Sequence, residues 1–327
     1  TWQVVNANQA RRLVVLGTGG TIAGRANRAN DNVGYVAGQV AVSELVAMVP
    51  ALATCPLDVE QVAQINSKDM VLSVWHALAA RVAEHLDRPE VAGIVITHGT
   101  DTIEETAFLL QTVLKPSKPV VLTCAMRPAT ALVPDGPQNL SDAVAVALHP
   151  EARGVVVVCA GRIHGAIDVA KVHPYRTDPF DSGDAGELGC VEEAQLRVFR
   201  PWPQAVPEGA FDAAALRRLK GAAALPRVEL IFSHANADGE VVRALLGQTA
   251  AAEPLRGIVV AGTGNGTVHD DLLAALKQAQ ASGVEVVVAS RCAHGRVVPH
   301  PGQPLPDSAG LSPVKARLAL ALQLLEA

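Results

Sequence analysis

The chain has 327 residues, of which 49% are hydrophobic and 18% charged, so it has enough apolar sequence for about two domains with buried cores and shows no sign of disorder. Lys and Arg number 27 against 32 Asp and Glu, and the absence of a basic stripe argues against nucleic acid or an anionic membrane as partner. The five cysteines lack CxxC spacing, which predicts neither a metal site nor a disulfide framework and favours a cytoplasmic location, with the periplasm as the alternative.

Short apolar runs alternate with helix-like segments through the first two hundred residues. Strands are expected at 13–16, 91–96, 119–123 and 154–159, and a helix at 103–113. Continuous Val/Ile runs are typical of strands that helices cover on both faces, so the alternation predicts an α/β fold with a mainly parallel sheet. Ligands bind such sheets beyond the carboxyl ends of the strands, which is where the Gly/Thr/Asp motifs of this chain fall.

The pattern weakens near residue 200, where several prolines surround a short helix expected at 213–220. We interpret residues 201–225 as a linker. It would join an N-terminal catalytic α/β domain (1–200) to a smaller C-terminal α/β domain (226–327). In the second domain the sequence predicts strands at 228–232, 257–261 and 284–289 and a final helix at 313–325.

The first motif is GTGGTIAG at residues 17–24, directly after the first predicted strand. A dinucleotide-binding GxGxxG loop is excluded because Ile22 occupies the third glycine position, and no Walker Lys-Ser/Thr pair follows. Two interpretations remain: a tight turn that needs flexible glycine backbone, or a mobile segment with a reactive hydroxyl near its start.

The second motif is THGTDT at residues 97–102, followed by a helix with two acids in its first turn. The simplest explanation is helix capping, with Asp101 or Thr102 as N-cap and the acids favoured by the helix dipole. Taken alone, His98 is a structural hydrogen-bond donor rather than a catalytic base.

Together, these motifs resemble the two signature segments of the bacterial-type asparaginase/glutaminase family. Further segments agree in order, and the resemblance covers practically the whole chain from Arg12 onward: NSKDM at 66–70, AMRP at 125–128, DGP at 135–137, DVAK at 168–171 and GNG at 264–266. The resemblance implies a two-domain asparaginase-like fold, with a larger N-terminal, mainly parallel sheet domain flanked by helices and a smaller C-terminal α/β domain. It also implies hydrolysis of L-asparagine to L-aspartate and ammonia through a threonine acyl-enzyme, without a metal or another cofactor.

The resemblance implies that two threonines face one substrate. Thr21 matches the family nucleophile, and Tyr35 matches the lid tyrosine beside it. Thr100, Asp101 and Lys171 match a second group, in which lysine and aspartate polarise a threonine hydroxyl. An alcohol needs a proton acceptor and an oxyanion site to attack an amide, so such partners are chemically necessary. Either threonine could be acylated, and we favour Thr21.

The substrate-binding residues that the resemblance implies are partly altered. Ser67 matches the serine that binds the α-carboxylate, Asp101 also binds the α-ammonium, and Asn265 is retained in the second domain. Lys68, however, stands where many relatives carry Gln or Glu, and a cation there repels the ammonium unless it turns outward and pairs with an acid. The stretch 292–302, where relatives lend a Glu across a subunit contact, contains no acid. A raised Michaelis constant for L-asparagine is therefore expected.

The resemblance also implies a homotetramer, in which each site is completed across a subunit interface. A broader asparaginase/glutaminase, or another ω-amidase, is the alternative function, because Asn and Gln differ by one methylene, typically ~1–3 kcal/mol of discrimination. A third possibility is a non-catalytic relative that binds an amino acid, which the presence of all five catalytic residues disfavours.

Overall fold

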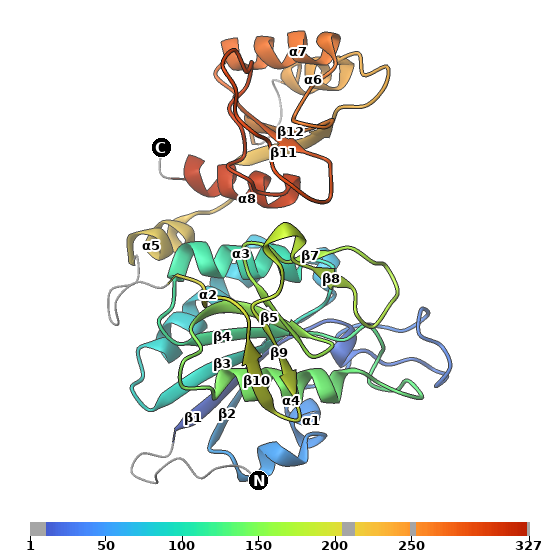
Figure 1. The fold of residues 1–327 in the computed structure, drawn as a ribbon, viewed down its shortest axis with the longest axis vertical. Helices are drawn as coiled ribbons and strands as arrows, with labels where there is room; N and C mark the ends of the chain where they lie inside the picture. Colours follow the sequence, from blue (N-terminus) through green and yellow to red (C-terminus); the bar gives the residue numbers. More distant parts are fainter. Residues whose placement is uncertain (1–10, 205–212, 249–252, 326–327) are drawn as a thin grey trace. The chain divides into compact units, whose positions relative to one another are not determined.

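The computed structural model describes residues 11–204, 213–248 and 253–325, and it divides the chain into two compact units, 1–216 and 217–327 (Figure 1). The division lies within the segment interpreted as a linker, and the helix expected there is α5 (Ala213–Gly221). The domain boundaries at 200 and 226 stay a prediction. Within the described ranges, no helix combines the length and apolar character needed to cross a membrane.

Unit 1 is built on one eight-stranded sheet. The pairings from β2 through β1, β3 and β4 to β5 are parallel, and those from β5 through β6 and β9 to β10 are antiparallel. The strand order is β10 (Gln195–Val198), β9 (Gly189–Glu192), β6 (Arg162–Gly165), β5 (Gly154–Cys159), β4 (Pro119–Thr123), β3 (Val91–Thr97), β1 (Arg12–Gly19) and β2 (Leu57–Ile65).

Helices cover both faces of this sheet, with α2 and α3 on one face and α1 and α4 on the other (Figure 1). Leu13 and Val15 of β1 share a core with Leu140 and Ala143 of α4, and side-chain alternation along the strand sends Val14 and Leu16 to the opposite face. All residues of β3, β4 and β5 are buried, which explains why they read as unbroken apolar runs. The helix bounds are α1 (Val42–Ala47), α2 (Leu72–Leu86), α3 (Ile103–Leu114) and α4 (Gly136–Ala147).

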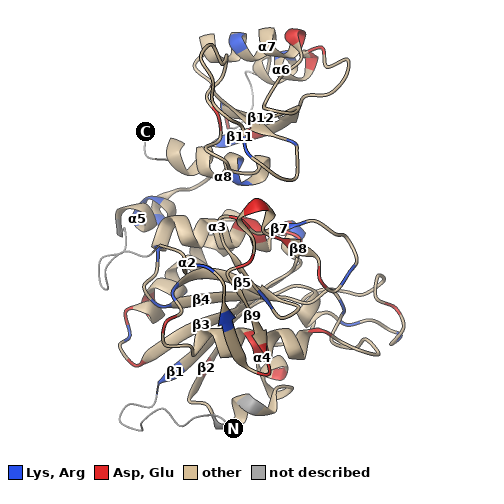
Figure 2. Ribbon diagram, viewed as in Figure 1, with Lys and Arg blue, Asp and Glu red and all other residues tan. Residues whose placement is uncertain are grey.

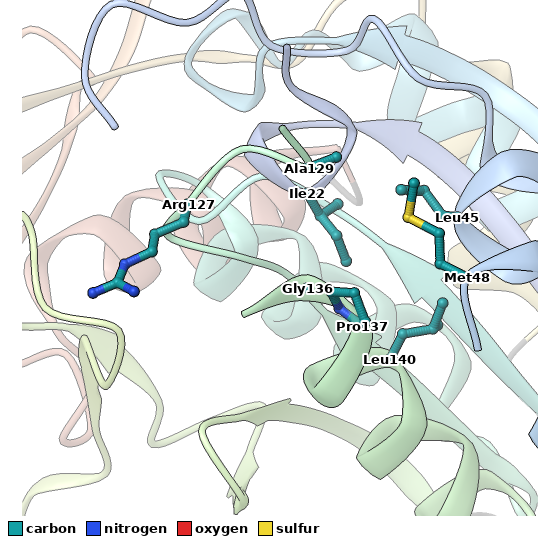
Figure 3. A pocket seen from close by; sticks show the side chains of 8 residues that line it. All are labelled: Ile22, Leu45, Met48, Arg127, Ala129, Gly136, Pro137 and Leu140. Atoms are coloured by element: carbon teal, nitrogen blue, oxygen red, sulfur yellow. The ribbon is translucent and has the colours of Figure 1, made fainter. Parts of the chain in front are cut away.

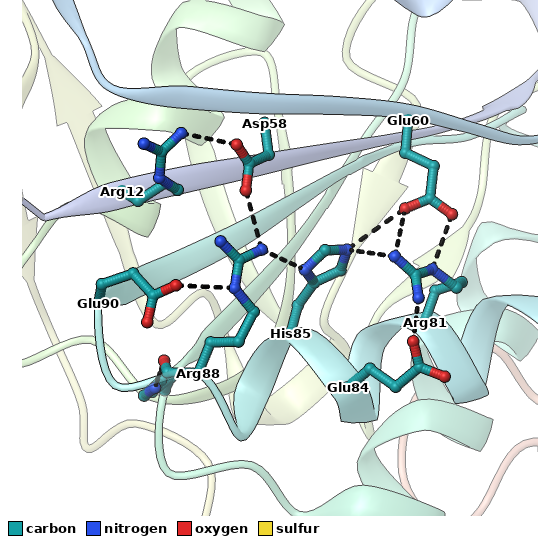
Figure 4. A network of polar contacts seen from close by, with 9 residues as sticks. Arg12, Asp58, Glu60, Arg81, Glu84, His85, Arg88 and Glu90 are labelled. Carbon is teal, nitrogen blue, oxygen red and sulfur yellow. Dashed lines mark hydrogen bonds and ion pairs between the residues drawn. The ribbon is translucent and has the colours of Figure 1, made fainter.

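The edge strand β2 is held by charged side chains and not by burial alone (Figure 4). Asp58 binds Arg12 at 2.6 Å and Arg88 at 2.8 Å. Glu60 binds Arg81 through both carboxylate oxygens, at 2.7 and 2.8 Å, and this hydrogen bonding lowers the pKa of Glu60. Exposed ion pairs stabilise little individually, but this network joins β1 and α2 to the unburied side of the edge strand.

Unit 2 is a smaller three-stranded parallel sheet with helices on both faces. Ile258 and Val260 pack with α7, whereas Val259 packs with α8, as the alternation of a strand requires. The predicted strands and final helix lie within two residues of those observed. The elements are β11 (Arg227–Phe232), α6 (Glu240–Leu246), β12 (Leu255–Gly262), α7 (Asp270–Ala281), β13 (Glu285–Ser290) and α8 (Pro313–Leu324).

Lys and Arg are interspersed with Asp and Glu over the described parts of both units that Figure 2 shows.

Candidate active site

The two motifs meet because their strands are neighbours. β1 and β3 are parallel and in register, with Gly17 opposite Thr97, so the loops that follow the two strands begin at the same edge of the sheet. Thr18 Oγ1 donates to the Thr97 carbonyl at 2.9 Å, which joins the two loops directly beyond the last paired residues. The motifs therefore form one site at the carboxyl ends of parallel strands, as the sequence pattern predicts.

Glycines allow the loops to touch through their backbones. Gly20 has φ +83°, and a Cβ on it would lie 2.4 Å from the Cα and N of Gly99. A Cβ on Gly99 would lie 2.4 Å from the hydroxyl oxygen of Ser67. An L side chain at either glycine would push the neighbouring segments apart, so both positions need glycine for close approach, and Gly20 needs it also for its positive φ.

Thr21 is held in a short 3₁₀ turn (Thr21–Ala23) and is 7% exposed. Its Oγ1 lies 2.5 Å from the phenolic oxygen of Tyr35. Gly24 leaves room for that ring, because a Cβ there would lie 2.8 Å from Tyr35 Cδ2. The hydroxyl therefore has a phenol as its hydrogen-bond partner.

The second threonine has a lysine as its partner. Lys171 Nζ donates to Thr100 Oγ1 at 2.8 Å and to Asp101 Oδ1 at 2.7 Å. The lysine side chain is 17% exposed and that of Asp101 51%, so the ion pair lies at the rim of the site. Since Thr100 accepts from the ammonium, its own proton stays available for donation to a ligand.

Lys171 reaches this position from a two-stranded ribbon, β7 (Ala170–Lys171) and β8 (Phe180–Asp181). Its backbone N–H donates to Glu104 Oε2 at 3.3 Å, so the first turn of α3 also holds the ribbon. This arrangement joins residues 71 positions apart in sequence, and no local pattern around Lys171 predicts it.

Helix capping does not account for the second motif. Thr102 is the N-cap of α3, but its side chain does not cap the helix and its Oγ1 donates to the Ser67 carbonyl at 2.8 Å. The Asp101 carboxylate faces Lys171, and the Asp101 N–H donates to Ser67 Oγ at 3.3 Å. The predicted N-cap position of Thr102 and the two acids in the first turn are confirmed, but the Asp101 and Thr102 side chains serve contacts between segments and neither caps the helix.

His98 is a structural residue, as its sequence context suggests. The Trp75 indole can only donate, at 2.9 Å, to Thr106 Oγ1, so the Thr106 proton points to His98 Nε2, also 2.9 Å away. Nδ1 then carries the proton of His98 and donates to the Gly99 carbonyl at 2.7 Å. Complete burial lowers the pKa of His98 to about 4, so the ring is neutral and braces the Thr100 loop.

The sequence interpretation missed Trp75 and Thr106, although a polar residue on the apolar face of the predicted helix 103–113 was a signal for the latter. It also missed Asp69, which pairs with Lys68. The Lys68 ammonium lies 2.8 Å from both Asp69 oxygens, and both side chains are more than 60% exposed. Lys68 is therefore paired with an acid, the alternative that the sequence left open.

Ser67 is 2% exposed and lies between the two motifs, whereas Asn265 belongs to unit 2. There its side chain is bound to the backbone of Val298, donating to the carbonyl at 3.0 Å and accepting from the N–H at 2.7 Å. Of the eight residues singled out in the sequence, seven lie in unit 1, and the eighth stabilises a loop of unit 2.

The chain is similar to known proteins over most of its length. Residues 12–204 match the family model "Asparaginase, N-terminal", and residues 227–326 match "Glutaminase/Asparaginase C-terminal domain". Glutaminase-asparaginase of Pseudomonas fluorescens biotype A is 38% identical over 300 residues, covering 90% of this chain and 80% of that protein. L-asparaginase 2 of Escherichia coli (strain K12) is 36% identical over 321 residues, covering 95% and 88%.

A solved structure is similar over nearly the full length of the chain. The crystal structure of a probable cytoplasmic L-asparaginase from Campylobacter jejuni matches with a TM-score of 0.87 and 37% identity, covering 97% of this chain and 95% of that one. The two-domain fold is therefore that of a whole relative and not of one shared domain.

Proposed function

The chain belongs to the asparaginase/glutaminase family, and we propose that it hydrolyses the side-chain amide of L-asparagine to L-aspartate and ammonia. The observation that carries this proposal is the pair of threonine hydroxyls at one sheet edge, each with its own proton partner. Thr21 is 2.5 Å from the Tyr35 hydroxyl, and Thr100 is 2.8 Å from the Lys171 ammonium. When an alcohol hydrolyses an amide, both the formation and the hydrolysis of the acyl-enzyme need such activation.

In the first half-reaction, Thr21 Oγ attacks the amide carbon and the C–N bond breaks. The proton that Thr21 loses is transferred to the nitrogen, which leaves as ammonia, and an ester to Thr21 remains. In the second half, water attacks that ester, its carbonyl–Oγ bond breaks, and Thr21 recovers a proton. Thr100, held by Lys171 and Asp101, is placed to donate to the substrate and to orient the water.

The substrate's amino-acid end fits Ser67 and Asp101. Ser67 Oγ accepts from the Asp101 N–H, which leaves its hydroxyl proton for a carboxylate. Lys171 engages Asp101 Oδ1, and half of the Asp101 side chain stays exposed to meet an ammonium. Lys68 contributes little repulsion because Asp69 already compensates its charge. Asn265 would complete the site from a second subunit of a homotetramer.

The alternative is a broader asparaginase/glutaminase or ω-amidase activity. It is favoured by the relative from Pseudomonas fluorescens, which is named a glutaminase-asparaginase, and a pocket discriminates one methylene by only ~1–3 kcal/mol. A non-catalytic amino-acid-binding role fits poorly with Thr21, Tyr35 and Lys171 in hydrogen-bonded positions. We further propose a cytoplasmic location, while noting that a Haemophilus influenzae relative is named a probable periplasmic L-asparaginase.

Ammonia release from L-asparagine and L-glutamine, measured side by side on the pure protein, tests the proposal. We expect faster release from L-asparagine, without added metal or cofactor. Thr21→Ala and Thr100→Ala should each lower kcat by about three orders of magnitude or more while leaving the circular dichroism unchanged. Release from neither amide would favour the binding protein, and a Thr21→Ala enzyme with more than about a tenth of the turnover would remove Thr21 as nucleophile.

A further inference from the structure

Tyr35 is carried by an exposed segment, residues 24–38, which we call the lid segment. At its base, Arg25 and Val36 exchange two backbone hydrogen bonds, of 3.0 and 2.9 Å. Beyond that pair the segment is mostly exposed, and Val33 reaches 78% exposure. A segment with so few buried apolar contacts has little local stability, so its conformation depends on contacts from elsewhere.

Those contacts come from residues 126–135, the latch loop, about a hundred positions later in the sequence. Two of them use the Thr130 hydroxyl, which accepts from the Ala26 N–H at 2.8 Å and donates to the Ala26 carbonyl at 3.5 Å. Two backbone hydrogen bonds also join the segments, from Leu132 N to Ala29 O at 2.9 Å and from Ala129 N to Gly24 O at 3.0 Å.

The latch loop is itself anchored at both ends. The Asp135 carboxylate accepts from the backbone N–H of Met126 at 2.9 Å and from that of Arg127 at 3.0 Å, which closes the loop across its base. The Arg127 guanidinium donates to the Val133 carbonyl at 3.1 Å. Asp135 directly precedes α4, so a rigid helix supports the loop.

The same helix supports the Thr21 turn. Gly136 packs against Ile22, the residue after Thr21, and a Cβ on that glycine would lie 2.9 Å from Ile22 Cγ1. A small apolar pocket marks this junction, and the Arg127 guanidinium points away from it (Figure 3). The pocket is lined by Ile22, Leu45, Met48, Arg127, Ala129, Gly136, Pro137 and Leu140.

We propose that Thr130 is a positioning residue for the amide hydrolysis. Its hydroxyl holds the lid segment against a loop that is fixed to the start of α4, the element that also supports the Thr21 turn. The Tyr35 hydroxyl is thereby kept at hydrogen-bond distance from Thr21 Oγ1. This inference rests on the proposed function, since the benefit of holding Tyr35 is a faster attack by Thr21.

The kinetic test compares Thr130→Val with Thr130→Ser and with a matched control, Thr112→Val on α3. Thr130→Val should lower kcat for L-asparagine about fivefold, equivalent to about 1 kcal/mol, with KM changed less than about twofold. The serine variant retains the acceptor and should recover most of the loss, and Thr112→Val should behave as wild type. In a Tyr35→Phe background, Thr130→Val should have no further effect, because the hydroxyl it positions is gone.

Hydrogen exchange gives a readout that needs no turnover. Thr130→Val should speed exchange of the amides at 25–36 and leave those of β3 and α3 unchanged, at an unaltered urea midpoint. An unchanged kcat, an equal loss of kcat in the Tyr35→Phe background, or unchanged exchange at 25–36 would each overturn the role of Thr130. If wild type releases no ammonia from L-asparagine, the proposed function fails, and the exchange result still decides whether Thr130 holds the lid segment.

Discussion

Acidification should destabilise unit 1 through two buried histidines. Burial lowers the pKa of both His98 and His164 to about 4 from the ordinary 6.5. Between these two values the unfolded chain binds a proton at each imidazole and the folded chain does not. Stability is therefore fully present above pH 6.5 and is lost as the pH falls toward 4. For each histidine this linkage amounts to about 2 kcal/mol between pH 7.5 and 5, or about 4 kcal/mol for the pair.

Urea unfolding at pH 7.5, 6.5, 5.75 and 5, followed by tryptophan fluorescence, measures this loss. All three tryptophans belong to unit 1, as do both histidines. His98→Asn and His164→Asn each retain an amide donor near the position of Nδ1 but cannot titrate. Each single variant should show about half of the wild-type pH dependence, and the double variant should show little.

His234→Asn is the matched control, because this imidazole is exposed in unit 2. It should leave the pH dependence of unit 1 unchanged. A wild-type protein that is equally stable at pH 7.5 and 5 would refute the reasoning. So would a double variant that keeps the full pH dependence, since the protons would then bind elsewhere.

Gly20→Ala should destabilise the protein by more than about 2 kcal/mol in urea and abolish most activity, because its Cβ would overlap the facing backbone at 2.4 Å. Gly186→Ala is the control, because Gly186 has a similarly positive φ but no atom within 4 Å of an added Cβ. If Gly186→Ala destabilises the protein as much as Gly20→Ala, the positive φ alone explains the loss of stability. Lys68→Gln should change KM for L-asparagine by less than about threefold, and Asp69→Asn, which releases the lysine charge, should raise it. A large fall in KM on Lys68→Gln would show that Lys68 repels the substrate ammonium, as the sequence predicts. Sedimentation should show a tetramer, and a fully active monomer would contradict the shared site.

The buried strands were the predictable part of the fold. β3, β4 and β5 lie within one residue of their expected bounds, because strands covered on both faces consist of little but Val, Ile and Leu. β2 was missed because Asp58, Glu60 and Gln61 interrupt its apolar residues, and the two acids among them face arginines that only the folded chain brings near. The antiparallel strands β6, β9 and β10 were missed because four residues give too short a pattern.

Within the site, the residues on the two motifs were predictable, and the supports from distant segments were not. Lys171 could be assigned only through the family resemblance, since a two-residue strand has no periodicity of its own. Thr130 lies between the segments AMRP (125–128) and DGP (135–137) and belongs to neither, and its contact with Ala26 spans 104 positions. The pairing of Lys68 with Asp69 compensates its charge, and the number of charges in the sequence does not reveal that geometry.

The site arises from the pairing of two strands and not from either motif. Gly17 and Thr97 are opposite each other, and Thr21 and Thr100 follow within four residues of that pair. Four residues span at most about 13 Å, so neither threonine can lie farther than that from the paired strand ends. The close approach of the Gly20 and Gly99 backbones then brings the two loops into direct contact. Each motif alone fits a turn or a helix cap, and their juxtaposition, on which the proposed site depends, follows from the register of β1 and β3.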